Sequence, residues 1–172
     1  MRTLKLQEDI IEHRAEFSPC GDYRYTLSRV WNPDAPPIAF IGLNPSTATA
    51  ELDDPTVRRC INFARNWGHG GMVMLNLFAY RATEPARLKA SPRPVGEGNN
   101  AAIAKAASLA LRGEGRILAA WGNHGAHLNR AAEVLALLKD APLFCLGITA
   151  SGQPLHPLYQ PGAAKPRHFP PS

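Results

Sequence analysis

Unbroken apolar runs, each followed by a polar segment, are the main pattern along this chain. The runs cover residues 38–41, 72–75, 116–120 and 142–145. Because an apolar run without alternation is typical of a strand buried on both faces, each run is expected to lie inside a sheet. Residues 23–31 alternate between polar and apolar positions instead, which predicts a half-exposed strand. Residues 1–21 show little pattern.

Helical patterns separate these strands. Asp54 followed by Pro55 predicts a helix start with a side-chain cap and a proline in the first turn, and Gly68 predicts the helix end. Further helices are expected over 83–88, from Asn99 or Asn100 to about residue 111, and over 127–139 with Leu128 facing inward. Strands that alternate with helices favour right-handed crossovers and a parallel sheet.

The predicted fold is therefore α/β, a three-layer α/β/α sandwich with a mainly parallel central sheet. Its 172 residues suit a single domain. Within it, residues 1–21 form an N-terminal extension, and the Pro-rich tail 162–172 is expected to wrap the surface.

Polar residues follow the ends of the predicted strands. Ligands of open α/β sheets bind outside the carboxyl ends of the strands, so these residues are candidates for an active site. The strand ends bring Asn44, Asn76, Asn123 or His124, and His156 toward one rim. A structural interpretation stays open for each, because Asn side chains also satisfy neighbouring backbone groups and a histidine in a Pro-rich loop can do the same.

Composition narrows the class of protein. No apolar stretch approaches the roughly 18 residues of a membrane span, and the first residues lack the apolar core of a secretory signal, so the protein is expected in the cytoplasm and not at a membrane. The three cysteines are dispersed, and no His or Cys spacing matches a metal motif, so neither a metal nor a cofactor is predicted. The net charge of +5 is compatible with a nucleic acid or nucleotide partner.

Several short motifs together resemble a bacterial and phage domain family of unknown function. They are Gly42-Leu43-Asn44-Pro45-Ser46-Thr47, Asp53-Asp54-Pro55-Thr56, Asn76-Leu77-Phe78-Ala79-Tyr80-Arg81-Ala82-Thr83, Trp121-Gly122 and His156-Pro157-Leu158-Tyr159. The resemblance covers roughly residues 23–161. It supplies no activity by itself.

The order of these motifs is also similar, more distantly, to the uracil-DNA glycosylase superfamily. That resemblance implies a hydrolase that cleaves an N-glycosidic bond, with Asn44 positioning the attacking water, Asn76 reading the base edge and His156 supporting the departing base. Asn44 and His156 are thus the predicted catalytic residues. The predicted substrate-binding residues are Pro45, Ser46, Asn76, Phe78, Tyr80, Arg81, Trp121, Asn123 and Tyr159.

Physical chemistry is compatible with these roles. A donor aimed at a base carbonyl stabilises the charge that develops on the leaving base, and an amide has both the donor and the acceptor that base recognition needs. Phe78 or Tyr80 could stack on a base, and Arg81 with the basic residues at 87, 89 and 93 could contact phosphates. Asp53, if exposed, could act as a base, although helix capping explains both aspartates.

The chain departs from the glycosylases where Leu158-Tyr159 replaces a Ser-rich loop that grips duplex DNA. A nucleobase, a nucleotide or single-stranded nucleic acid is therefore a more suitable partner than duplex DNA. The alternative is a module that binds a nucleotide or single-stranded nucleic acid without catalysis. Substrate identity and oligomeric state stay open at this stage.

Overall fold

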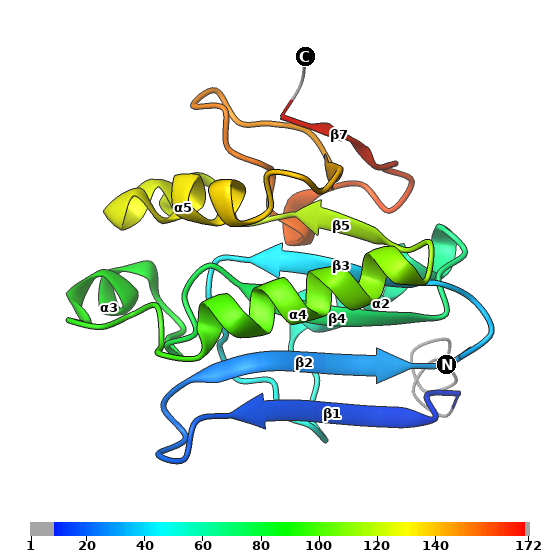
Figure 1. The fold of residues 1–172 in the computed structure, drawn as a ribbon, viewed down its shortest axis with the longest axis horizontal. Coiled ribbons are helices and arrows are strands. Elements are labelled where there is room, and N and C mark those ends of the chain that lie inside the picture. Colours follow the sequence, from blue (N-terminus) through cyan, green and yellow to red (C-terminus); the bar gives the residue numbers. More distant parts are fainter. Residues whose placement is uncertain (1–8, 171–172) are drawn as a thin grey trace.

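A computed structural model describes residues 9–170 and folds them around one mixed sheet flanked by helices (Figure 1). The strands are β1 Glu12–Phe17, β2 Arg24–Val30, β3 Pro37–Gly42, β4 Gly71–Asn76, β5 Arg116–Ala119, β6 Leu143–Cys145 and β7 Arg167–Phe169. The helices are α2 Pro55–Asn66, α3 Pro85–Ala90, α4 Asn99–Arg112 and α5 Arg130–Leu137, with short 3-10 segments η1 Asn123–Asn129 and η2 Pro157–Tyr159.

The strand order in the sheet is β1-β2-β4-β3-β5-β6-β7. The four strands formed by apolar runs, β4, β3, β5 and β6, are parallel neighbours. β1, β2 and β7 pair antiparallel at the two sides. The predicted α/β class is confirmed, but the sheet as a whole is mixed, because strands with alternating or weak apolar patterns extend the parallel centre on both sides.

Side chains of β3 show how both faces of the sheet are covered. Ile38 and Phe40 belong to a buried cluster with the apolar face of α2, whereas Ala39 and Ile41 belong to a second cluster with α4 and α5. All four side chains are fully buried, as the unbroken apolar run predicts. The carboxyl end of β3 thus lies between α2 on one face of the sheet and α4 and α5 on the other.

The expected helix over 127–139 begins later than predicted. Leu128 and Asn129 have φ values of 53° and 56°, so the chain passes through the left-handed region before α5 begins at Arg130. Leu128 is 59% exposed and does not face inward, which corrects that prediction. Ala131 and Leu138, by contrast, are buried.

The cap of α2 is confirmed, and the cap of α4 is not. Asp54 accepts a hydrogen bond from the Val57 backbone N–H at 2.9 Å. α4 begins after Gly98 without a side-chain cap, because Asn99 is fully buried and its Nδ2 donates to the carbonyl oxygens of Asn76 and Leu77. Asn99 therefore supports the end of β4 instead of its own helix.

Both end segments of the chain contribute strands that the sequence pattern did not reveal. β1 lies within 1–21, and β7 lies within 162–172. Over residues 9–170, the structure contains no helix with the length and apolar character needed to cross a membrane.

Candidate functional site

A cavity of about 780 Å³ lies at the carboxyl ends of β3, β4 and β5. Its walls come from the loop after β3, the first turn of α2, the end of β4 and the segments around 121–124 and 149–160. Asn44, Asn76 and His156 all line it, although they are far apart in the sequence. The loops after β3 and β4 run side by side here, since Leu77 N–H donates to Gly42 O and Phe78 N–H donates to Leu43 O.

The Asn44 side chain has a structural role through Nδ2, and its Oδ1 remains available to a ligand. Its Nδ2 donates to the carbonyl oxygens of Ala82 at 2.7 Å, Pro45 at 3.1 Å and Tyr80 at 3.4 Å. Since only the nitrogen of an amide donates, these carbonyls fix its orientation and leave Oδ1 on the other side. Within residues 9–170, Oδ1 accepts no hydrogen bond, so it is free to accept one from a ligand or a water.

Asn76 is 2% exposed, and its Nδ2 is enclosed without a hydrogen-bond partner in the described part of the chain. An unpaired buried amide group costs about 1–3 kcal/mol, so it marks a place where a ligand group would be stabilising. Its Oδ1 lies next to Gly42, where an added Cβ would come within 3.1 Å of it. The absence of a side chain at position 42 therefore leaves room for this amide.

His156 presents a neutral imidazole to the cavity. Its Nδ1 accepts a hydrogen bond from the Leu158 backbone N–H at 3.2 Å, which caps η2 and places the ring proton on Nε2. Burial lowers the pKa of His156 below its ordinary value of 6.5, while Asp54 opposes this shift electrostatically. Arg59 on α2 donates to the carbonyl oxygen of Gln160 and so holds this segment against the helix.

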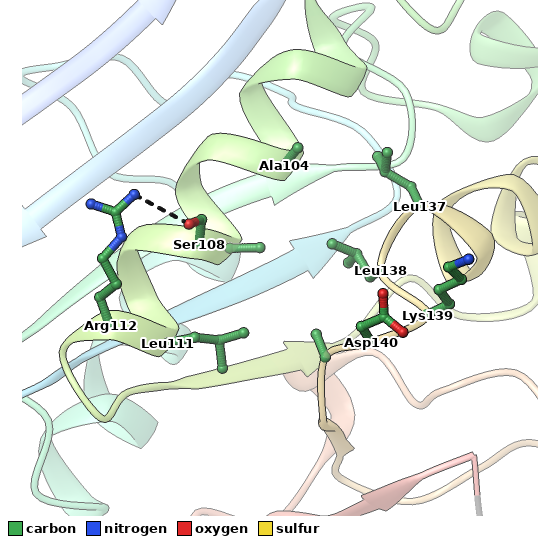
Figure 2. A pocket seen from close by; sticks show the side chains of 10 residues that line it. Ala104, Ser108, Leu111, Arg112, Leu137, Leu138, Lys139 and Asp140 are labelled. Carbon is green, nitrogen blue, oxygen red and sulfur yellow. Dashed lines mark hydrogen bonds between the residues drawn. The ribbon is translucent and has the colours of Figure 1, made fainter.

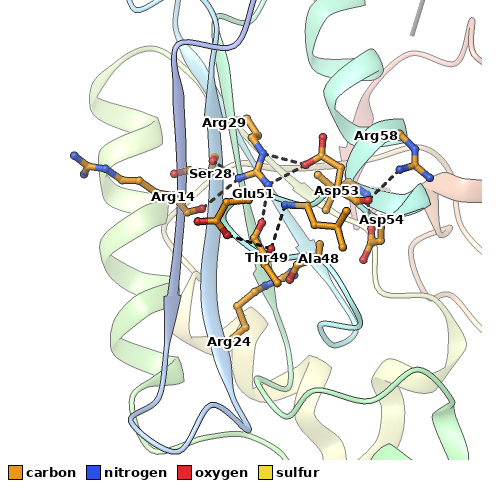
Figure 3. Close-up of polar contacts among 12 residues, drawn as sticks. Arg14, Arg24, Ser28, Arg29, Ala48, Thr49, Glu51, Asp53, Asp54 and Arg58 are labelled. Carbon is orange, nitrogen blue, oxygen red and sulfur yellow. Dashed lines mark hydrogen bonds and ion pairs between the residues drawn. The ribbon is translucent and has the colours of Figure 1, made fainter. Parts of the chain in front are cut away.

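Asp53 and Asp54 have different environments despite being adjacent. Asp53 is buried in an ion pair with Arg29, in which Arg29 Nη2 and Asp53 Oδ1 are 2.8 Å apart. Figure 3 shows this pair at the loop 48–54. That pairing makes Asp53 unsuitable as a catalytic base. Asp54 caps α2 and also lines the cavity, so it supplies a carboxylate to the same cavity wall as Asn44 and His156.

Arg24, at the start of β2, also lines the cavity and is 2% exposed. It donates from Nη1 to the carbonyl oxygen of Ala48 at 3.1 Å, and its Nε is enclosed without a partner in residues 9–170 (Figure 3). Burial lowers the pKa of Arg24 to about 10, so the guanidinium still carries its charge at neutral pH.

The remaining predicted residues that line the cavity are Pro45, Ser46, Trp121, Asn123 and Tyr159. Trp121 is also packed in the core and donates from Nε1 to Gln153 Oε1 at 2.8 Å. Asn123 Oδ1 accepts from the Thr149 hydroxyl at 2.6 Å. Tyr159 is 81% exposed, and its ring centroid lies 5.8 Å from that of His156, so this aromatic side chain stands at the cavity mouth.

Phe78, Tyr80 and Arg81 are not among the residues that line the cavity, so the structure does not bring them together with the other predicted site residues. Phe78 is fully buried in the core, Tyr80 packs edge to face with the Tyr23 ring, and the Arg81 guanidinium lies over the Phe17 ring. The physical reason is that backbone groups of 79–81 bond to segments 94–95 and 22–24, which turns this stretch away from the rim.

A second, smaller hollow of about 470 Å³ lies between α4 and α5 (Figure 2). Its charged lining residues, Arg112, Lys139 and Asp140, are all exposed to solvent. The cavity at the strand ends differs because it encloses polar groups that lack partners. Among residues 9–170 there is no cluster of three or more His, Cys, Asp or Glu side chains arranged to hold a metal ion.

The sequence pattern did not identify Arg24 as a cavity residue, and it did not indicate that Asp54 lines the cavity in addition to capping α2. Arg24 occurs in an alternating strand, where an arginine is ordinarily read as a solvated residue. Asp54 occurs at a helix start, where capping accounts for it completely. Only the antiparallel pairing of β2 with β4 brings Arg24 beside the parallel strand ends.

No curated protein matches the chain at a significant level. A comparison with known protein families matches residues 24–158 to a family described as "Protein of unknown function (DUF1643)". The matched segment includes every element that lines the cavity up to Leu158 and leaves out β1 and β7. Because it extends over most of the sequence, the chain belongs to this family of proteins of unknown function.

Proposed function

We propose that the cavity binds a nucleobase and that the protein hydrolyses the N-glycosidic bond which joins this base to its sugar. The observation that carries the proposal is that Asn44, Asn76 and His156 line one cavity, each with hydrogen-bonding capacity that no group of residues 9–170 uses. A further support is that helices cover both faces of a parallel sheet centre, as the proposed three-layer, uracil-DNA glycosylase-like arrangement requires.

Asn76 and Tyr159 would hold the base. The buried amide offers a donor and an acceptor to the polar edge of a planar heterocycle. The exposed ring of Tyr159 at the mouth offers a stacking surface, and stacking of a base on an aromatic ring contributes about 1–3 kcal/mol. Tyr159 thereby takes the stacking role that the sequence suggested for Phe78 or Tyr80.

Hydrolysis forms a bond between a water oxygen and the anomeric carbon and breaks the bond from that carbon to the base nitrogen. The bonding electron pair leaves with the base, whose carbonyl oxygen then gains negative charge. The Nε2–H of neutral His156 would donate to this oxygen, an interaction that strengthens as the charge develops. The water would be oriented by Asn44 Oδ1 and would lose its proton to the carboxylate of Asp54.

The test is release of free base from single-stranded oligonucleotides and from deoxynucleosides and their 5′-monophosphates that contain uracil or hypoxanthine. The proposal predicts base release by the wild type and a loss of about 10²–10³ in turnover for His156→Ala, because one donor to the developing charge is removed. His13→Ala is the matched control, since His13 is exposed on β1 and outside the cavity.

Base release from none of these substrates would refute hydrolysis. Binding without release, weakened by Asn76→Ala, would instead support a non-catalytic nucleotide-binding module. Equal turnover by His156→Ala and wild type would remove the role given to the imidazole.

A further inference from the structure

Two arginines of β2 are buried in the same region, but only one has its charge neutralised. Arg29 is fully buried, and Asp53 Oδ1 accepts from its Nε at 3.0 Å and its Nη2 at 2.8 Å. Arg29 also donates to the carbonyl oxygens of Ser28 and Thr49. Arg24 has a single hydrogen bond, to a neutral carbonyl, and no carboxylate of residues 9–170 lies within 4.0 Å of it. Figure 3 shows both side chains reaching the loop 48–54.

A buried cation without a counter-ion is costly, and buried charges in proteins are ordinarily paired. Asp54 acts on Arg24 electrostatically, but the two side chains are not in contact at ion-pair distance. The guanidinium, which Asp54 balances only from beyond ion-pair distance, is stabilised further if an anion from outside occupies the cavity that Arg24 lines.

The cavity wall carries further groups suited to an anion. Hydroxyl side chains line it at Ser46, Thr47, Thr56 and Thr83, and the Ser46 and Thr83 oxygens are 3.3 Å apart. The N-terminal turn of the twelve-residue helix α2 contributes to the same wall, where the helix dipole favours negative charge. Hydroxyl groups and a buried arginine are the donors that commonly bind phosphate.

We propose that Arg24 forms a phosphate subsite and that the substrate is a free mononucleotide. This inference rests on the proposed nucleobase site and specifies its substrate class. The cavity volume of about 780 Å³ lies within the usual range for a small-molecule site. Because Arg24 is only 2% exposed, its surroundings suit a terminal phosphate monoester better than a diester whose chain must continue in both directions.

The basic residues that the sequence pattern suggested as phosphate contacts are less suitable than Arg24. Arg87, Lys89 and Arg93 are exposed and solvated, and Arg81 donates to Gly21 O and stacks on Phe17. An exposed cation gains little from a phosphate, because water screens the interaction. Arg24 is enclosed and therefore interacts with an anion more strongly.

The test is calorimetric titration of the protein with deoxyuridine, deoxyinosine, their 5′-monophosphates and inorganic phosphate, using His156→Ala to slow turnover. We expect at least one monophosphate to bind roughly 10- to 100-fold more tightly than its nucleoside, the range expected for hydrogen bonds to a charged group. In Arg24→Met this ratio should fall to about one. Arg87→Met on α3 is the matched control and should keep the wild-type ratio.

Arg24→Lys is the second variant, in case Arg24→Met does not fold, and it should give a ratio between those of wild type and one. Equal affinity for nucleoside and monophosphate in the wild-type background overturns the proposal, as does a ratio that survives both Arg24 substitutions. Absence of binding by both monophosphates and by inorganic phosphate also overturns it. Tighter binding of a uracil-containing oligonucleotide than of the monophosphate overturns the free mononucleotide as substrate.

Failure of the proposed hydrolysis gives a different result. Arg24-dependent binding of a monophosphate without base release by the wild type supports the phosphate subsite and refutes hydrolysis. Base release at equal rates from nucleoside and monophosphate, unaffected by Arg24→Lys, supports hydrolysis and refutes the subsite.

Discussion

The ion pair between Arg29 and Asp53 holds the loop 48–54, which ends at the cavity residue Asp54, and breaking it provides a quantitative test. The side chains are 0% and 3% exposed, and Arg29 Nη2 also donates to Thr49 O at 2.7 Å. Asp53→Ala removes the counter-ion and leaves the guanidinium buried. Loss of one partner of a buried pair costs about 3–5 kcal/mol, a large part of the 5–15 kcal/mol that stabilises a typical domain.

For a chain of this length each kcal/mol corresponds to about 2–4 °C in Tm, so Asp53→Ala should lower Tm by roughly 6–20 °C. Urea unfolding measures the free energy directly. Glu12→Ala is the control, because Glu12 pairs with Arg14 at the surface, where the Arg14 and Glu12 side chains are 74% and 40% exposed and the pair contributes at most about 1 kcal/mol.

The double variant Arg29→Met with Asp53→Leu separates loss of charge pairing from loss of packing. It replaces both ions by apolar side chains of similar size, so it should be more stable than Asp53→Ala alone. A loss below about 1 kcal/mol for Asp53→Ala, or a double variant less stable than this single variant, would refute the reasoning.

Three further predictions concern the supports of the cavity. Gly42→Ala brings a methyl group to 3.1 Å from Asn76 Oδ1 and should lower nucleobase affinity about tenfold in calorimetry, whereas unchanged affinity would argue against a role for this amide. Asn99→Ala removes two buried hydrogen bonds and should lower the unfolding free energy in urea by about 1–3 kcal/mol. Burial lowers the pKa of both His69 and His156 below 6.5. Below that pH the unfolded chain therefore binds more protons than the folded chain. The free energy of unfolding should decrease as the pH falls from 6.5, and it should decrease less steeply in His156→Gln.

The centre of the fold could be predicted because its strands depend on local patterns. Unbroken apolar runs give the four parallel strands, and the Asp54-Pro55 pair gives the start of α2. The outer strands depend on pairing instead. β1 has a mixed burial pattern, and β7 comprises only three residues, so each forms because a neighbouring strand offers free backbone groups.

The same distinction applies to the cavity. Asn44, Asn76 and His156 follow strand or loop ends, so topology alone predicts that they converge. Phe78, Tyr80 and Arg81 follow the same strand end as Asn76, but tertiary backbone bonds turn them away from the rim. The burial of Arg24 could not be predicted, because it results from the tertiary contacts of β2 and not from the local sequence pattern of that strand.

The most direct test of the central claim is a crystal structure of His156→Ala with the tighter-binding monophosphate. We expect the base beside Asn76 and Tyr159 and the phosphate within hydrogen-bond distance of the Arg24 guanidinium. A nucleotide bound outside this cavity, or one whose base is far from Asn76, would contradict it.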